Sequence, residues 1–107
     1  ATVDVNGQQI DGPTESVMQL GNLKAKWESF GWKVFETDGN DLNELRAIMQ
    51  MAKTSAHRGF PQVILMKTVM GKGVDFMEGT HKWHGVAPND AELANALTQL
   101  EQTLGDY

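Results

Sequence analysis

The chain has 107 residues, which suits a single domain, and its 40% hydrophobic and 21% charged residues are ordinary for a globular protein. This composition argues against disorder, and no apolar run is long enough to span a bilayer. The net charge is -5 and Lys and Arg form no cluster, whereas nucleic-acid binding needs a concentrated basic surface. We therefore expect neither nucleic acid nor a membrane as a partner.

Cysteine is absent from the sequence, which removes disulfides and thiolate metal sites and suits a reducing compartment. The first residues also lack the basic start and the long apolar core of a signal peptide. On these two grounds we expect a cytoplasmic protein.

The first part of the chain predicts a strand, a loop and a helix. Residues 1–5 alternate between apolar and polar side chains, which is typical of a strand. Residues 6–14 are rich in Asn, Gly and Pro and predict an ordered loop. A helix is predicted over residues 20–30, ending at Gly31, because apolar side chains recur there at helical spacing. These side chains are Leu20, Leu23, Trp27 and Phe30.

A second strand and a second helix follow. Trp32, Val34 and Phe35 predict a short strand, and the turn residues 38–40 end it. Asp41 and Glu44 have the spacing of a capping pair and predict the start of a helix that ends within residues 55–61. Its predicted buried face consists of Leu42, Leu45, Ile48, Met49 and Ala52.

The run Val63–Met66 is apolar without alternation, which is typical of a strand that is covered on both faces. Strands and helices therefore alternate along the chain, and this order predicts an α/β fold with a parallel sheet flanked by helices. Ligands of such sheets gather at the carboxyl ends of the strands. A last helix, starting at Asn89 or Asp90 with Glu92 behind it, has an apolar face of Leu93, Leu97, Leu100 and Leu104.

Two loops should open on the same edge of this sheet, one after Val5 and one from Gly71 through Pro88. In the first, the amide oxygen of Asn6 has the chemistry to bind a hard cation, but an Asn-Gly pair is more often a plain turn. In the second, Gly71-Lys72-Gly73 has the glycines and the charge of a phosphate cradle. It lacks the remaining residues of a Walker loop, which favours a turn with a solvated lysine.

His81 and His84 flank Trp83 in the second loop. Their spacing fits no zinc signature, so hydrogen bonding or acid-base chemistry is a better interpretation than metal binding. Trp83 must pack against a neighbour to be stable in a loop.

Three further side chains that attract attention have structural explanations. The positions of Trp27 on an apolar helix face and of Trp32 at a strand start predict that both belong to the core. His57 follows the end of a helix beside Arg58, and we expect it on the surface.

Four segments together, in order and spacing, resemble transketolase: residues 4–12, 30–32, 68–73 and 84–88. The likeness extends over almost the whole chain. It is closest to transketolases in which the diphosphate-binding and pyrimidine-binding domains are separate polypeptides. We therefore expect residues 1–107 to be the C-terminal portion of the diphosphate-binding (N-terminal) domain, with an incomplete thiamine-diphosphate-binding fold.

The resemblance implies a Mg²⁺ or Ca²⁺ ion that bridges the diphosphate of thiamine diphosphate to the protein. Asn6 matches the family's side-chain ligand, and Gln8 matches a ligand that binds through its backbone carbonyl. Ile10 matches an apolar residue beside the thiamine rings. His84 matches the histidine that lies near the cofactor diphosphate and the donor sugar, so it is the candidate catalytic residue. No family role is transferred to Lys72, His81 or Trp83.

The implied reaction transfers a two-carbon ketol unit from a ketose to an aldose, with sugar phosphates of carbohydrate metabolism and the pentose phosphate reactions as substrates. The family's Gly-Asp-Gly segment and the glutamate of the pyrimidine-binding domain have no match in this chain. We therefore expect it to be inactive alone. The implied partners are the remainder of its domain and a pyrimidine-binding subunit or domain, in a dimer or an α2β2-type assembly.

Two alternatives stay open at this point. Beside transketolase, the chain could be a non-catalytic α/β module with a role in assembly or regulation. It could also be part of another thiamine diphosphate enzyme, such as a pyruvate dehydrogenase component or deoxyxylulose phosphate synthase. The segment Trp83–Pro88 favours transketolase among the thiamine enzymes. The exposed edge that we expect at Val3 predicts a partner and poor solubility of the isolated chain in either case.

Overall fold

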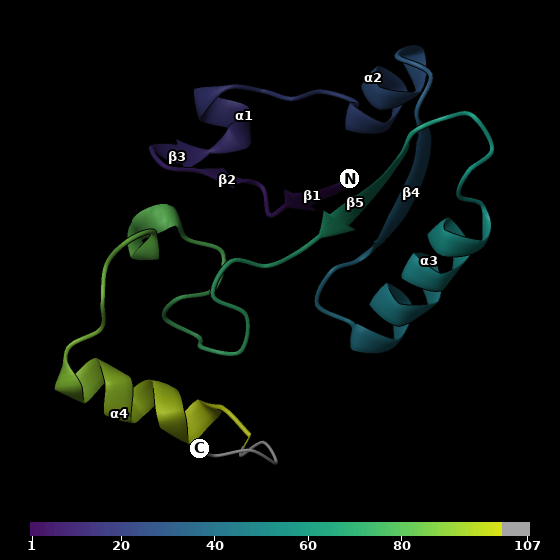
Figure 1. The fold of residues 1–107 in the computed structure, drawn as a ribbon. Helices are drawn as coiled ribbons and strands as arrows, with labels where there is room; N and C mark the ends of the chain where they lie inside the picture. Colours follow the sequence, from purple (N-terminus) through teal and green to yellow (C-terminus); the bar gives the residue numbers. More distant parts are fainter. Residues whose placement is uncertain (102–107) are drawn as a thin grey trace.

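The fold is organised around β5 (Gln62–Lys67), the central strand of a parallel three-stranded sheet in the order β1-β5-β4 (Figure 1). In the computed structural model, which describes residues 1–101, β1 (Thr2–Val5) and β4 (Lys33–Asp38) flank β5. Along the register, Leu65 lies beside Val3 on one side and beside Glu36 on the other. The predicted α/β class with a parallel sheet is confirmed.

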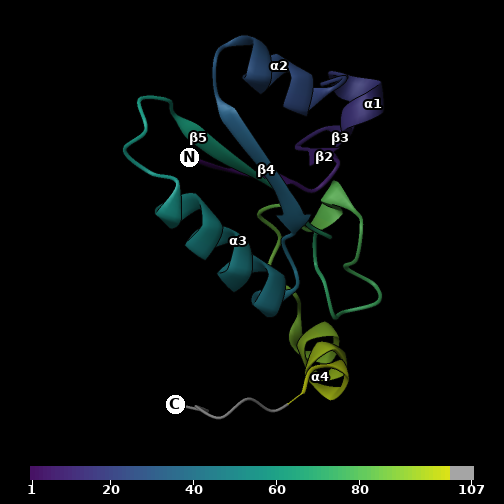
Figure 2. The same ribbon diagram turned by 90° about the vertical axis from the view of Figure 1, so that its right-hand side faces the viewer.

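Burial of β5 explains its continuous apolar sequence. Val63, Ile64 and Leu65 are 0%, 6% and 4% exposed, although consecutive side chains of a strand point to opposite faces. Both faces of the sheet are therefore covered at this strand. Figure 2 shows α2 (Leu23–Ser29) and α3 (Leu42–Thr54) on opposite sides of the sheet.

The connection from β1 to α2 contains more regular structure than the sequence predicted. The strands β2 (Gln8–Gln9) and β3 (Gly12–Pro13) form a small antiparallel hairpin, and the one-turn helix α1 (Thr14–Val17) follows it. Strands of two residues are too short for periodicity to reveal them. The ordered loop predicted for residues 6–14 is therefore a hairpin followed by the start of a helix.

Helix α2 is shorter than the predicted helix over residues 20–30. The side chain of Asn22 accepts a hydrogen bond of 2.9 Å from the backbone N–H of Ala25, so the helix begins at Leu23. It ends at Ser29, which leaves Phe30 beyond the last turn and 80% exposed. Phe30, one of the four apolar side chains on which the predicted helix rested, therefore lies outside the observed helix.

Trp27 and Trp32 pack on each other, edge to face, with ring centroids 4.8 Å apart. Both side chains are half-buried. Trp32 precedes β4, which begins at Lys33 and not at the tryptophan. The pair thus connects α2 to the start of β4, and it lies at the margin of the core and not in its centre.

The predicted start of α3 is confirmed, with one difference. Asp41 accepts hydrogen bonds from the backbone N–H groups of Asn43 (2.8 Å) and Glu44 (3.0 Å). The Glu44 carboxylate does not return to the cap but accepts from the backbone N–H of Asp38 at 3.1 Å and from the Thr37 hydroxyl at 3.3 Å. Glu44 therefore ties α3 to the carboxyl end of β4.

The predicted buried face of α3 is wrong at two of its five positions. Leu42 is 81% exposed and Met49 is 49% exposed, whereas Leu45, Ile48 and Ala52 are half-buried. The helix packs beside β4, an edge strand, and covers the sheet with a narrow stripe only.

The chain beyond β5 forms a long loop with the 3-10 helix η1 (His81–Trp83) and then α4 (Asp90–Gln99). Asn89 and Glu92 exchange two hydrogen bonds of 2.8 and 2.9 Å, which confirms the predicted capping pair. The predicted apolar face is largely uncovered. Ala96 is buried, Leu93, Leu97 and Leu100 are 46%, 61% and 45% exposed, and Leu104 lies outside the described residues.

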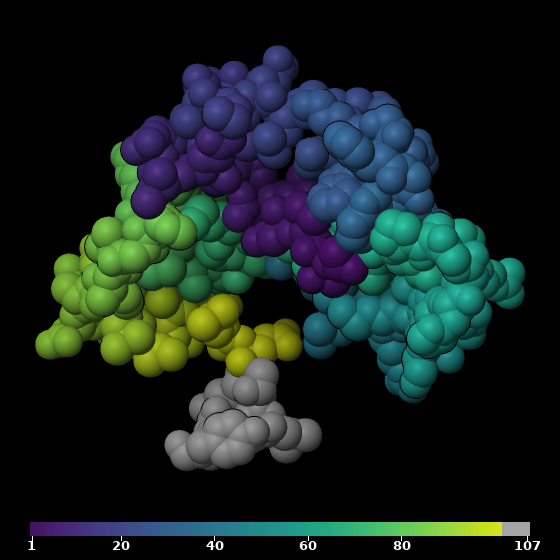
Figure 3. Space-filling view, turned by 45° about the horizontal axis from the view of Figure 1, so that its top comes forward, coloured from purple at the N-terminus to yellow at the C-terminus, as the bar shows by residue number. Residues whose placement is uncertain are grey.

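The arrangement of the elements is open, because α4 lies away from the sheet in both ribbon views. The Cα radius of gyration is 16.9 Å, against about 13 Å expected for a compact domain of this length. Figure 3 shows the chain arching over a hollow between α3 and α4. Within residues 1–101, no helix has both the length and the apolar content needed to cross a bilayer.

Candidate functional site

The candidate site lies where the three parallel strands end. Because β1, β4 and β5 run in the same direction, their carboxyl ends lie at one edge of the sheet. The loop after β1 and the loop from Gly71 through Pro88 lie side by side in both ribbon views (Figures 1 and 2). The prediction that these two loops open on the same edge is confirmed.

Asn6 follows β1 directly and is half-buried. Its Oδ1 accepts a hydrogen bond of 2.9 Å from the backbone N–H of Gln8, and its Nδ2 donates to Oδ2 of Asp4 at 3.5 Å. Gly7 lies between Asn6 and Gln8 with a φ of 72°, a conformation that glycine adopts without strain. The amide group therefore has one defined orientation, with its oxygen toward Gln8.

The backbone carbonyl of Gln8 is directed away from the hairpin. Gln8 pairs with Pro13 in the antiparallel ladder, and proline has no N–H to donate. The pair is therefore of the type that exchanges no hydrogen bonds, and the N–H and C=O of Gln8 both point away from β3. Since the N–H of Gln8 points to Asn6 Oδ1, its carbonyl oxygen lies on the same side of the strand as that amide.

These two oxygens have the donor chemistry that Mg²⁺ and Ca²⁺ prefer. An amide oxygen has two lone pairs, so the hydrogen bond from Gln8 leaves one free on Asn6. Within residues 1–101, no three His, Asp or Glu side chains gather closely enough to hold a metal ion. The residues present thus fit part of a hard-cation site.

Ile10 lies between the two strands of the hairpin and is 68% exposed. An apolar side chain of this exposure is available for contact with a ligand or with another polypeptide. The predicted contact with the thiamine rings would therefore be made from the surface of the chain.

The backbone of His84 is fixed by the residues around η1. The Trp83 indole N–H donates to the Phe76 carbonyl at 3.0 Å, and the two rings pack edge to face at 5.4 Å. The backbone N–H of His84 donates to the carbonyl of His81 at 2.9 Å, and its side chain is exposed. Trp83 was predicted to pack against a neighbour, and this neighbour is Phe76. The exposed imidazole of His84 lies on a turn whose backbone these contacts hold in place.

The segment Gly71-Lys72-Gly73 is a turn built around Glu78. The Glu78 carboxylate accepts from the backbone N–H of Gly73 at 2.9 Å and lies 3.9 Å from the Lys72 ammonium group. An anion of the chain thus occupies the position that a bound phosphate would need. This geometry favours the turn over the phosphate cradle.

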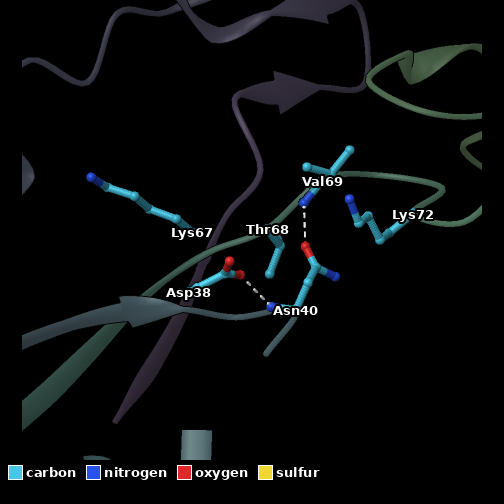
Figure 4. Close-up of a pocket in the computed structure, with 6 residues that line it drawn as sticks. All are labelled: Asp38, Asn40, Lys67, Thr68, Val69 and Lys72. Carbon is cyan, nitrogen blue, oxygen red and sulfur yellow. Dashed lines mark hydrogen bonds between the residues drawn. The ribbon is translucent and has the colours of Figure 1, made fainter. Parts of the chain in front are cut away.

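Cavities open at the carboxyl edge. One, of about 160 Å³, has Asn6 and Gln8 in its wall, together with Leu23 and Trp27 of α2. Another, of about 260 Å³, lies between the ends of β4 and β5 (Figure 4). It is lined by Asp38, Asn40, Lys67, Thr68, Val69 and Lys72.

Asn40 connects the ends of β4 and β5, which sequence analysis missed. Its Oδ1 accepts a hydrogen bond of 2.7 Å from the backbone N–H of Val69, and its own N–H donates to Asp38 Oδ1 at 2.8 Å (Figure 4). The signal was an Asp-Gly-Asn turn directly after a strand, but its partner is 29 residues away in the chain and leaves no local pattern.

The comparison with protein families shows to which family the chain belongs. The model described as the thiamine diphosphate binding domain of transketolase matches residues 1–105. The chain belongs to this family. The resemblance and the fold class predicted from the sequence are thereby confirmed.

Individual transketolases agree with this assignment. The chain is 32% identical over 105 residues to one of the subunits of apulose-4-phosphate transketolase from Phocaeicola vulgatus, covering 97% of this chain and 36% of the relative. It is 35% identical over 102 residues to 6-deoxy-6-sulfo-D-fructose transketolase subunit SqwG of a Clostridium species, covering 95% and 36%. The crystal structure of Campylobacter jejuni transketolase superimposes with a TM-score of 0.81 at 30% identity, over 92% of this chain and 15% of that one. The chain therefore spans about a third of the length of the subunits that it matches.

Gly71 offers a test of how the loop before His84 is held. A Cβ on Gly71 would overlap the Met77 carbonyl group, whereas a Cβ on Gly79 would meet nothing within 4 Å. The two glycines have similar φ angles of 70° and 66°, so the backbone strain of an alanine is equal at both. We expect Gly71→Ala to lower the free energy of unfolding by about 1–3 kcal/mol more than Gly79→Ala, as measured by urea unfolding. Equal losses would contradict the close approach.

Proposed function

We propose that the chain supplies part of the metal and diphosphate site of a thiamine-diphosphate-dependent transketolase and is inactive alone. The observation that carries this proposal is the pair of oxygens of Asn6 and Gln8 at the carboxyl edge, in a chain that belongs to the transketolase diphosphate-binding family. The reaction would transfer a two-carbon ketol unit from a ketose to an aldose. In this reaction thiamine diphosphate supplies the stabilisation of a carbanion.

The protein residues would bind and orient. We propose that Asn6 Oδ1 and the Gln8 carbonyl bind a Mg²⁺ or Ca²⁺ ion that neutralises the cofactor diphosphate. Ile10 would cover the thiamine rings with its exposed apolar side chain. The exposed imidazole of His84 would donate a hydrogen bond to the diphosphate or to the donor sugar and so fix the sugar in place.

The remaining ligands would come from the rest of the domain and from a pyrimidine-binding partner. Two relatives are named as transketolase subunits, which supports a separate partner polypeptide for this chain, in a dimer or an α2β2-type assembly. The exposed leucines of α4 and the open shape agree with burial against other parts of such an assembly.

The names of these relatives also bear on the substrate. They refer to sugars that carry a phosphate or a sulfo group. We propose that the donor is an anionic ketose, for which the histidine of the η1 turn is a suitable contact.

Asn6 is the residue whose replacement tests the metal assignment. In the assembled protein, Asn6→Ala should raise the Kd for thiamine diphosphate in the presence of Mg²⁺ by about tenfold or more, because one cation ligand is lost. Isothermal titration calorimetry measures this change. Asn43→Ala, an exposed asparagine on α3, is the matched control and should bind as the wild type does. Unchanged binding by Asn6→Ala would contradict the assignment.

His84 tests the second part of the proposal. We expect His84→Ala to lower kcat/KM for the donor ketose by about 100-fold, because a positioned hydrogen-bond donor is removed. His57→Asn provides the control, since His57 is an exposed residue with a φ of 61°, a conformation that asparagine tolerates. Steady-state kinetics measures kcat/KM for both variants. Equal values for His84→Ala and His57→Asn would contradict a role of His84 in the site.

A further inference from the structure

Three side chains at the carboxyl edge are linked in a way that the proposed metal site does not explain. Asp4 Oδ1 accepts a hydrogen bond from the Thr68 hydroxyl, and Asp4 Oδ2 accepts from Nδ2 of Asn6 at 3.5 Å. Thr68 follows β5, whereas Asp4 and Asn6 belong to β1 and its loop. The Asp4 carboxylate therefore connects the end of the central strand to the amide of Asn6.

The parallel register brings these groups to one face of the sheet. Asp4 pairs with Met66, and Thr68 is two residues beyond Met66, as Asn6 is two residues beyond Asp4. Since side chains two apart in an extended segment point to the same face, all three project from the same side. The backbone N–H of Thr68 also donates to the Val5 carbonyl at 3.4 Å, which extends the pairing past the end of β5.

Gly39, at the end of β4, holds Thr68 from the other side. A Cβ on Gly39 would lie 2.5 Å from Cγ2 of Thr68, so the threonine methyl packs directly against the glycine backbone. A β-branched side chain has few allowed rotamers. Contact of the methyl with Gly39 therefore directs the hydroxyl toward Asp4.

The amide of Asn6 can be placed in two orientations that differ by exchange of oxygen and nitrogen. The carboxylate of Asp4 accepts hydrogen bonds only, so it selects the orientation in which Nδ2 faces Asp4 and Oδ1 faces Gln8. A hydrogen bond from the amide nitrogen to a carboxylate also increases the negative charge on Oδ1 through polarisation. Both effects favour binding of a cation by that oxygen.

We propose that Thr68 and Asp4 are positioning residues, which hold the Asn6 amide with its oxygen directed at the cation. This inference rests on the proposed function, because it assumes that Asn6 is a cation ligand. Thr68 and Asp4 act through two hydrogen bonds, the one that Thr68 donates to Asp4 and the one that Asn6 donates to Asp4.

Thr68→Val is the first variant for the test, since valine keeps the methyl against Gly39 and removes the hydroxyl. Asp4→Asn is the second, and the double variant combines both changes. Thr37→Val is the matched control, because the Thr37 hydroxyl also bonds a carboxylate, that of Glu44 at 3.3 Å, but lies on β4, which does not adjoin β1.

The experiment measures the Kd of Mn²⁺, with thiamine diphosphate present, by electron paramagnetic resonance of the assembled protein. Thr68→Val and Asp4→Asn should each raise this Kd by about tenfold, and the double variant should raise it no further than the larger single effect. Thr37→Val should leave the Kd at its wild-type value. Thermal unfolding of the cation-free protein is recorded for every variant, because a merely structural role would lower the unfolding temperature and leave the Kd unchanged.

Each result decides the question. Wild-type affinity for Mn²⁺ in Thr68→Val and Asp4→Asn would overturn the inference and leave the proposed function intact. Fully additive effects in the double variant would also overturn it, since the two residues would then act separately. No binding of Mn²⁺ by the wild type would overturn the proposed function and this inference with it.

Discussion

Burial of the central strand is the constraint on which the rest of this structure depends. Val63, Ile64 and Leu65 bring apolar side chains to both faces of β5, so each face must be covered, and β1 and β4 pair with this strand on its two sides. Because all three strands are parallel, their carboxyl ends meet at one edge. Asn6, Gly39 and Thr68 come from distant parts of the sequence and lie together there for that reason.

The site at this edge is built from backbone geometry as much as from side chains. Pro13 has no N–H for Gln8, which directs the Gln8 carbonyl toward the side where the amide oxygen of Asn6 lies. Asn40 ties the end of β4 to the loop after β5. These contacts fix the start of each loop. Oxygens that protein contacts hold in place reduce the conformational entropy that is lost when a cation binds.

Sequence patterns predicted the parts of the fold that depend on local chemistry. The apolar run of β5, the cap at Asp41 and the capping box at Asn89 were all readable, because each rests on residues close together in the chain. Contacts between distant segments left no such signal. The hydrogen bond from Thr68 to Asp4, for example, joins residues that are 64 positions apart in the chain. Exposure was misjudged for Leu42 and Met49 of α3, because an apolar stripe shows which face can be buried and not whether a neighbour covers it.

The central claim is that the cofactor site is divided between this chain and other parts of a transketolase. Its most direct test is calorimetric titration of thiamine diphosphate with Mg²⁺ into the assembled protein and into this chain alone. The account predicts binding by the assembly and none by the chain, because it assigns only two of the cation's ligands, Asn6 and Gln8, to this chain. Binding by the isolated chain with the affinity of the assembly, or binding by neither, would contradict it.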